Sequence, residues 1–272
     1  MTDLPNYAQP PVVETILVVQ FDPLPALQNA HLGVFWKELG QSWPNVDDAP
    51  PLEPQFERFT DESLWADVGF KLKLTNAPHC RVQIKNVSGN RMLQIQNGKL
   101  VFNWIGLDGK PYPRYEAIRA EAVEMARMWE SFVAREHLGE FTPNQWEVTY
   151  LNHIPKGTVW NTPEEWTFFK PFGAVSDVET GAKLESYSGQ WHFALTDMRG
   201  RLHATWQHAK TADSKEVLVL NLTARGPVTK TEDRLNAVFS GLDFGRESIV
   251  KFFRSMMTTR ANTYWGLENA AH

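Results

Sequence analysis

The chain contains a single cysteine, Cys80, among 272 residues, so no disulfide can form within it. It also lacks a long apolar run, and no stretch approaches the roughly 20 apolar residues that a transmembrane helix requires. The first residues carry neither a basic cluster nor the apolar segment of a secretory signal. These absences predict a soluble protein of the reducing cytoplasm that makes no membrane contact.

Several catalytic and nucleotide-binding motifs are missing as well. The sequence has no Gly-x-x-x-x-Gly-Lys loop and no Gly-x-Gly-x-x-Gly turn, which argues against a P-loop or Rossmann nucleotide site. A Gly-x-Ser-x-Gly nucleophile elbow is also absent. We therefore expect no cofactor and assign no catalytic residue. The sequence leans towards a non-enzymatic protein without deciding the question.

An excess of basic residues is missing too, since the net charge is −5. Such a chain carries no overall field that would attract nucleic acid. The C-terminal region is mildly basic and keeps nucleic-acid binding open as an alternative, although a solvated helix face explains the same charges. Its basic residues are Arg225, Lys230, Arg234, Arg246, Lys251, Arg254 and Arg260.

What the chain does contain is a pattern in its second half that resembles the pattern of its first half. Apolar strands at 12–21 and 146–154 each lead through a turn into a short helical stretch, then into further strands and a long amphipathic helix. We predict an α+β fold of two related β-α-β(n)-α halves, 1–140 and 141–272, with antiparallel sheets each packed against a long helix. One continuous sheet would resemble the saddle of the TATA-binding fold, and two facing sheets would resemble a helix-grip fold.

The two long helices differ in regularity. Apolar residues spaced four and three apart predict an uninterrupted helix over 115–137. The later pattern, from Leu235 to Met256, contains Gly241 and Gly245, and we expect these to interrupt it, with Asp243 capping a second segment.

The strands are marked by turn residues and by alternation. Asn97-Gly98 separates two alternating runs and predicts a two-residue hairpin with positive φ at both turn positions. Three strands at 183–195, 201–209 and 216–224 form a predicted meander. Residues 44–67 combine four prolines with many carboxylates and predict an acidic surface loop, a candidate contact surface.

Six short stretches, in this order and at these spacings, resemble one protein family. They are Pro10-Pro11-Val12-Val13-Glu14, Asn29-Ala30-His31-Leu32, Pro50-Pro51-Leu52-Glu53-Pro54, Gln94-Ile95-Gln96-Asn97, Tyr112-Pro113-Arg114-Tyr115-Glu116 and Pro143-Asn144-Gln145-Trp146-Glu147-Val148-Thr149-Tyr150. The family is a sporadically distributed, functionally uncharacterised group of prokaryotic proteins of about this length. The resemblance spans nearly the whole chain and implies a bacterial protein without an assigned reaction. Patchy inheritance suggests an accessory role, such as defence or a toxin–antitoxin system.

Glu14 and Glu147 occupy equivalent places in the first strand of each predicted half. Buried paired carboxylates can bind a cation or act as acid and base, because burial raises a carboxylate pKa. With Tyr150 and Arg114 they form the candidate ligand-binding set of a pocket between sheet and helix. The structural alternative is that each carboxylate pairs with an arginine, such as Arg114 or Arg119.

A dense group of aromatic residues in a loop-like stretch provides a candidate partner-binding site. Its members are Trp160, Trp166, Phe168 and Phe169. Exposed aromatics at this density are typical of a protein interface. The alternative is a loop that packs back over the sheet.

Histidines offer no convincing metal site. His192, His203 and His208 fall on adjacent predicted strands, but His203 and His208 are five residues apart and face opposite sides of a regular strand. We therefore expect no metal. Together these observations predict a non-enzymatic protein-interaction or regulatory protein of the bacterial cytosol, acting through a protein partner or by self-association. A small-ligand-binding protein or enzyme, and a nucleic-acid-binding protein, are the alternatives.

Overall fold

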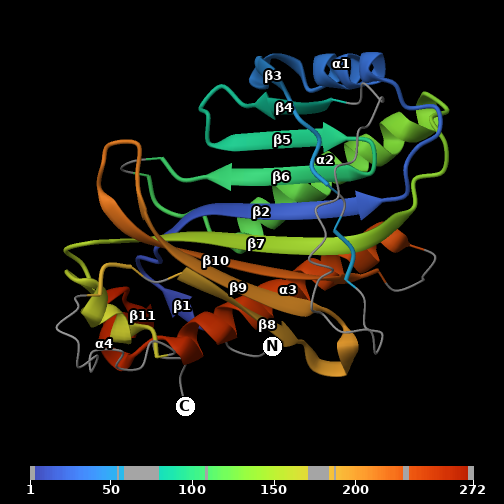
Figure 1. The fold of residues 1–272 in the computed structure, drawn as a ribbon. Coiled ribbons are helices and arrows are strands. Elements are labelled where there is room, and N and C mark those ends of the chain that lie inside the picture. The colour runs from blue at the N-terminus through green and yellow to red at the C-terminus, as the bar shows by residue number, and fades with distance from the viewer. Residues whose placement is uncertain are drawn as a thin grey trace.

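One large antiparallel sheet dominates the computed structural model, which describes residues 4–53, 55–57, 80–107, 110–170, 184–186, 188–228 and 233–268. Its strands are β2 (Val12–Phe21), β3 (Asn45–Ala49), β4 (Arg81–Lys85), β5 (Arg91–Gln96), β6 (Lys99–Ile105), β7 (Pro143–Pro155), β8 (Ser188–Ala194), β9 (Arg201–Lys210) and β10 (Glu216–Pro227). They lie in the order β3-β4-β5-β6-β2-β7-β10-β9-β8 (Figure 1). The predicted meander is confirmed as β8, β9 and β10.

Two long helices, α2 (Tyr115–Arg135) and α3 (Arg234–Met256), pack on one face of this sheet (Figure 1). The fold is therefore α+β with an antiparallel sheet, as predicted. The remaining elements are α1 (Asn29–Glu38), α4 (Thr259–Tyr264), the short 3-10 helices η1 (Gly40–Ser42), η2 (Pro163–Phe168) and η3 (Thr196–Met198), and a ribbon of β1 (Asn6–Tyr7) with β11 (Leu267–Glu268). Within the described ranges, no helix is both long and apolar enough to cross a membrane.

The core lies between the sheet and the two long helices. Residues of alternate parity on the central strands point towards the helices, as Phe21 of β2 does towards Trp129 of α2, with ring centroids 6.3 Å apart. The opposite face of the sheet is polar but largely buried. Gln94, Lys99 and Gln145 are each less than 9% exposed there. Residues 50–53 and 55–57 cross this second face (Figure 1).

The expected interruption of the last long helix is wrong, because α3 is continuous through Gly241 and Gly245. Both glycines lie against strand β7. A β-carbon on Gly241 would stand 2.2 Å from the indole of Trp146, and one on Gly245 would stand 2.7 Å from Val148. The glycines therefore allow close helix–sheet packing. Asp243, expected to be a cap, instead pairs with Arg119 of α2 at 2.6 Å.

The predicted hairpin is confirmed, since Gln96 pairs with Lys99 across a two-residue turn. Only Gly98 has positive φ, at 92°, so the expectation of positive φ at both turn positions is wrong. The Asn97 side chain serves another purpose, because its amide group bonds both the N–H and the C=O of Leu24. The predicted loop 44–67 also needs correction: residues 45–49 form the edge strand β3, while 54 and 58–67 lie outside the described residues.

Candidate functional site

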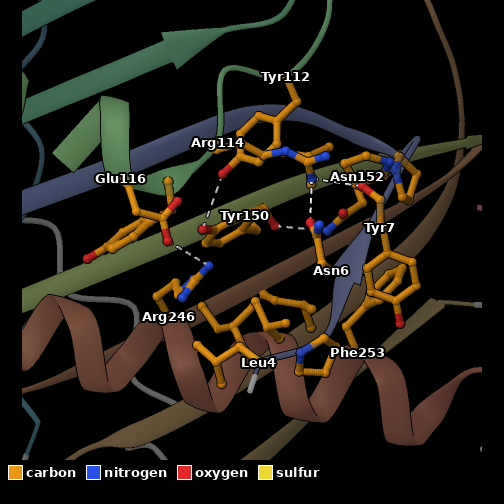
Figure 2. A pocket seen from close by; sticks show the side chains of 18 residues that line it. Leu4, Asn6, Tyr7, Tyr112, Arg114, Glu116, Tyr150, Asn152, Arg246 and Phe253 are labelled. Carbon is orange, nitrogen blue, oxygen red and sulfur yellow. Dashed lines mark hydrogen bonds and ion pairs between the residues drawn. The ribbon is translucent and has the colours of Figure 1, made fainter. Parts of the chain in front are cut away.

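A cavity of about 290 Å³ lies between the helix-bearing face of the sheet, α3 and strand β1. Two of its walls come from the start of α2 and from the N-terminal segment (Figure 2). Its lining residues fall into a polar end and an apolar end. The polar side chains are those of Asn6, Tyr7, Tyr112, Arg114, Tyr115, Glu116, Tyr150, Asn152 and Arg246.

The N-terminal segment is fixed as a wall of the cavity by Arg114. Its guanidinium donates from Nη1 to the Asn6 side-chain oxygen at 2.7 Å and to the Tyr7 carbonyl at 2.8 Å. On the other side, Tyr7 donates a buried hydrogen bond of 2.7 Å to Asn262 of α4. Residues far apart in the sequence thus meet at the wall of the cavity.

Arg114 also has an unusual backbone. It precedes the first residue of α2 with φ 74° and ψ 154°, a conformation that is essentially restricted to glycine. Such a residue costs about 1–3 kcal/mol and persists only where its surroundings hold it. The backbone brings the guanidinium to the cavity beside the start of α2. Strain of this kind is typical of functional sites.

Two tyrosines from different elements meet in the polar end. The hydroxyl of Tyr112 lies 3.3 Å from that of Tyr150 and donates to it (Figure 2). Burial is the main cause that raises the pKa of both phenols above 10.0. Both are therefore neutral at physiological pH. Since Tyr150 accepts from Tyr112, its own proton can be donated into the cavity.

Arg246 of α3 provides a second guanidinium. It lies over the ring of Tyr115 at 5.2 Å from the centroid and forms an ion pair of 3.1 Å with Glu116 (Figure 2). The Glu116 side chain is 68% exposed, so this pair is weak and readily exchanged. The Nε of Arg246 is buried and has no hydrogen-bond partner in the described part of the chain. A ligand anion could therefore replace Glu116 at this guanidinium.

The other end of the cavity is apolar. Its lining comes mainly from α3, through Ile249, Val250 and Phe253, with Leu222 of β10 and Leu4 opposite. Phe253 is held by an edge-on contact with Tyr7, with ring centroids 5.4 Å apart. The arrangement offers charge and hydrogen-bond donors at one end and hydrocarbon at the other.

The structure brings two of the four predicted ligand-binding residues together and separates them from the other two. Tyr150 and Arg114 line the cavity. Glu14 and Glu147 lie on the second, polar face of the sheet, which no described helix covers and which is called the helix-free face below. They are about 13 Å apart along the sheet, because Glu14 opposes Leu151, four residues beyond Glu147.

The two carboxylates also differ in their partners. Glu14 accepts a hydrogen bond of 2.7 Å from Asn103, and burial is the main cause that raises its pKa. Glu147 is 3.6 Å from Arg225. Neither contacts Arg114 or Arg119, the arginines suggested from the sequence, since these bind the N-terminal segment and Asp243.

The predicted partner-binding aromatics are core residues in this structure. Trp160 and Trp166 are both 0% exposed and meet edge-on, while Phe168 and Phe169 are at most 5% exposed. The indole N–H of Trp160 donates to the carbonyl of Ile154 at 2.9 Å. The stretch therefore follows the alternative that the sequence left open, in which it packs back over the sheet.

The histidines and the cysteine lie apart from the cavity. As predicted, His203 and His208 face opposite sides of β9: His203 bonds Glu57, whereas His208 lies against Trp160. Within the described ranges, no three His, Cys, Asp or Glu side chains are grouped to hold a metal ion. Cys80 is half-buried, and burial is the main cause that raises its pKa. Its thiolate form is disfavoured accordingly.

The predicted basic region does not form one surface. Arg225 lies on the helix-free face and Arg246 in the cavity on the opposite side, while Lys251 pairs with Glu247. Lys230 lies outside the described residues.

Sequence reasoning missed Arg246, Tyr112 and Asn152 as cavity residues. In the sequence Arg246 is one residue of a mildly basic region, and a single arginine in a helical pattern carries no signal of its own. Searches against family models, curated proteins and solved structures found no match to this chain.

Proposed function

We propose that the chain is a small-ligand-binding protein and that its ligand is an organic anion with an apolar group, bound between the sheet and α3. Among the described residues that line the cavity, two are arginines, Arg114 and Arg246, and one is a carboxylate, Glu116. The neutral phenols of Tyr112 and Tyr150 add donors. Ligand pockets of this kind combine apolar walls with a few convergent polar groups.

The observation that carries the proposal is the position of Arg246. Its side chain is partly buried and forms its ion pair with the exposed carboxylate of Glu116. Its Nε is buried and has no hydrogen-bond partner among the described residues. A carboxylate ligand can take both donor positions in the bidentate geometry that arginine favours. The first two residues of α2, Tyr115 and Glu116, also line the cavity, and the N-terminus of a helix favours negative charge nearby. The apolar remainder of the ligand would lie against Ile249 and Phe253.

Thermal shift and calorimetry with matched probes test this. Short- and medium-chain linear and aryl carboxylates would be compared with the alcohols of the same carbon skeleton. We expect carboxylates to raise the melting temperature and alcohols to have a much smaller effect. Arg246→Gln should weaken carboxylate binding about ten- to a hundredfold, since a charge-assisted hydrogen bond contributes about 1.5–3 kcal/mol.

Arg127→Gln is the matched control, because Arg127 is also on a long helix but bonds Glu130 and Asp233 outside the cavity. Tyr150→Phe removes one hydroxyl and should reduce affinity while keeping the fold. Equal responses to acids and alcohols, or full binding by Arg246→Gln, would contradict the proposal.

We further propose that the fold consists of two related halves, 1–140 and 141–272. Several features support this. Within the large sheet, the first strand of each half, β2 or β7, pairs with that of the other half, and the last strands, β6 and β10, flank this pair. In each half the last of these strands is followed by a long helix, α2 or α3, on the same face. A single rotation that superposes β2, β6 and α2 on β7, β10 and α3 is the expected result, and failure to superpose would contradict the relationship.

A further inference from the structure

A second site lies on the opposite side of the sheet, where the chain covers its own polar face. The described residues 50–53 and 55–57, called the strap here, run across the strands (Figure 1). Two glutamines of the sheet hold the strap by its backbone. Gln96 accepts from the N–H of Leu52 at 2.7 Å and donates to its C=O at 2.8 Å.

The second glutamine, Gln145 of β7, repeats this contact further along. It accepts from the N–H of Glu57 at 2.9 Å and donates to the carbonyl of Gln55 at 2.5 Å. Paired donor and acceptor contacts of this kind recognise an extended backbone whatever its side chains are. They require no particular sequence in the segment they hold.

Two strap side chains bond side chains of the sheet face. The side-chain oxygen of Gln55 accepts from Nη1 of Arg225 at an exposed position, and Glu57 is the buried one. The Glu57 carboxylate is 6% exposed and bonds Arg201, lies 2.6 Å from Nε2 of His203, and lies 3.2 Å from Nε of Arg225. The arginine side chains are only 7% and 13% exposed. This pocket of two guanidiniums and an imidazole selects a negative charge at one position.

The apolar side chains of the strap point away from the sheet. Phe56 is 57% exposed and Leu52 is 37% exposed. A segment that served only to cover the sheet would gain most by burying these groups, since each buried apolar side chain contributes about 1.5–3 kcal/mol. The strap is held instead by polar contacts, which water and a competing segment can replace.

We propose that the helix-free face is a binding site for an extended acidic peptide segment of a partner protein, and that the strap occupies this site within the chain. A partner would supply backbone amides to Gln96 and Gln145 and a glutamate or aspartate to Arg201, His203 and Arg225. Release of the strap would remove the Glu57 carboxylate from Arg201, His203 and Arg225, while Glu147 stays 3.6 Å from Arg225. The helix-free face should therefore favour segments that carry a carboxylate at this position.

The test uses the full chain carrying Glu57→Ala and a fluorescent peptide with the sequence of residues 50–57. We expect the peptide to bind this variant at least tenfold more tightly than the wild-type chain, whose own strap competes. Replacing the final glutamate of the peptide by glutamine should weaken its binding to this variant at least tenfold. The double variant Glu57→Ala/Gln145→Leu should bind the peptide more weakly than Glu57→Ala alone.

Glu53→Ala is the matched control protein, because Glu53 is an exposed carboxylate of the same strap. It should behave as the wild type. A folded Glu57→Ala chain that does not bind the peptide would overturn the proposal. Binding of inorganic phosphate without any affinity for the peptide would overturn it as well, in favour of a simple anion site.

Hydrogen exchange on the wild-type chain provides a second test that needs no variant. The amides of Leu52 and Glu57 are expected to exchange faster than the paired amides of β7, through local release of the strap. If the strap amides exchange only with global unfolding, the strap is a fixed part of the fold and the proposal fails.

Discussion

The indole of Trp146 on β7 occupies the place that a side chain on Gly241 of α3 would need. A β-carbon there would lie 2.2 Å from Cδ1 of the indole, well inside van der Waals contact. The glycine is thus what allows α3 to lie against the central strands, and α3 in turn carries Arg246 into the cavity. Helix geometry, sheet packing and the candidate site depend on the same small residue.

Gly241→Ala is therefore expected to destabilise the protein, although alanine is the better helix former by about 1 kcal/mol. Either Trp146 or the helix must move, and overpacking of this kind costs about 1–3 kcal/mol or more. Gly33→Ala in α1 is the control, because a β-carbon there meets nothing within 4 Å. Urea unfolding should give a loss for the first variant and a gain for the second. A stabilising Gly241→Ala would mean that α3 does not pack this closely.

A second prediction concerns the backbone of Arg114. Arg114→Ala and Arg114→Gly both remove the bonds to Asn6 and Tyr7, but only glycine relaxes the conformation at φ 74° and ψ 154°. The glycine variant should be about 1–2 kcal/mol more stable than the alanine variant, because the relief of strain exceeds the entropy that glycine gains on unfolding. Denaturant unfolding of the pair measures this. An alanine variant as stable as the glycine variant would contradict the strained conformation.

Pattern reasoning predicted the α+β class, the hairpin at 97–98 and the meander, because these depend on local periodicity and turn chemistry. It failed at Gly241 and Gly245, where a rule about helix breakers competes with a contact to a strand about 95 residues earlier in the chain. The position of Trp146 cannot be read from the helix itself, so the local rule gave the wrong answer.

The candidate site was predicted less well than the fold, for a related reason. Glu147 and Tyr150 are three residues apart on β7, so strand alternation alone places them on opposite faces of the sheet. Glu14 opposes Leu151 and therefore shares the face of Glu147. What the local pattern does not show is which face the helices cover, because that depends on contacts between residues far apart in the sequence.

The buried tryptophans give a third prediction. Trp160→Ala should lower stability by about 3–5 kcal/mol, as is usual for the loss of a large core side chain, and it also leaves the Ile154 carbonyl without its indole donor. Tyr264→Ala is the control, since Tyr264 is 53% exposed. Circular dichroism during thermal unfolding separates the two. A Trp160→Ala variant as stable as the control would place the aromatic stretch outside the core and restore it as a surface site.

The last prediction concerns the acid sensitivity of the strap. Burial alone would raise the pKa of Glu57, but the hydrogen bond with His203 and the charges of Arg225 and Arg201 together lower it below its ordinary 4.5. A carboxylate with a lowered folded-state pKa stabilises the fold above its unfolded pKa and loses this contribution as the pH falls through the folded value. The wild-type chain should therefore exceed Glu57→Gln in stability at pH 7 by about 1–3 kcal/mol.

The difference between the two chains should shrink as the pH falls below about 4.5, because a protonated Glu57 resembles glutamine. Among the described residues, the groups that face Glu57 are Arg201 and His203 of β9 and Arg225 of β10, and Glu147 lies beyond Arg225. These groups are common to both chains, so their own titration affects the difference only through Glu57. Urea unfolding from pH 7 to pH 3, with Glu53→Gln as the exposed control, measures the effect. A difference that stays constant across this range would mean that Glu57 is not held as an ionised carboxylate between the two arginines.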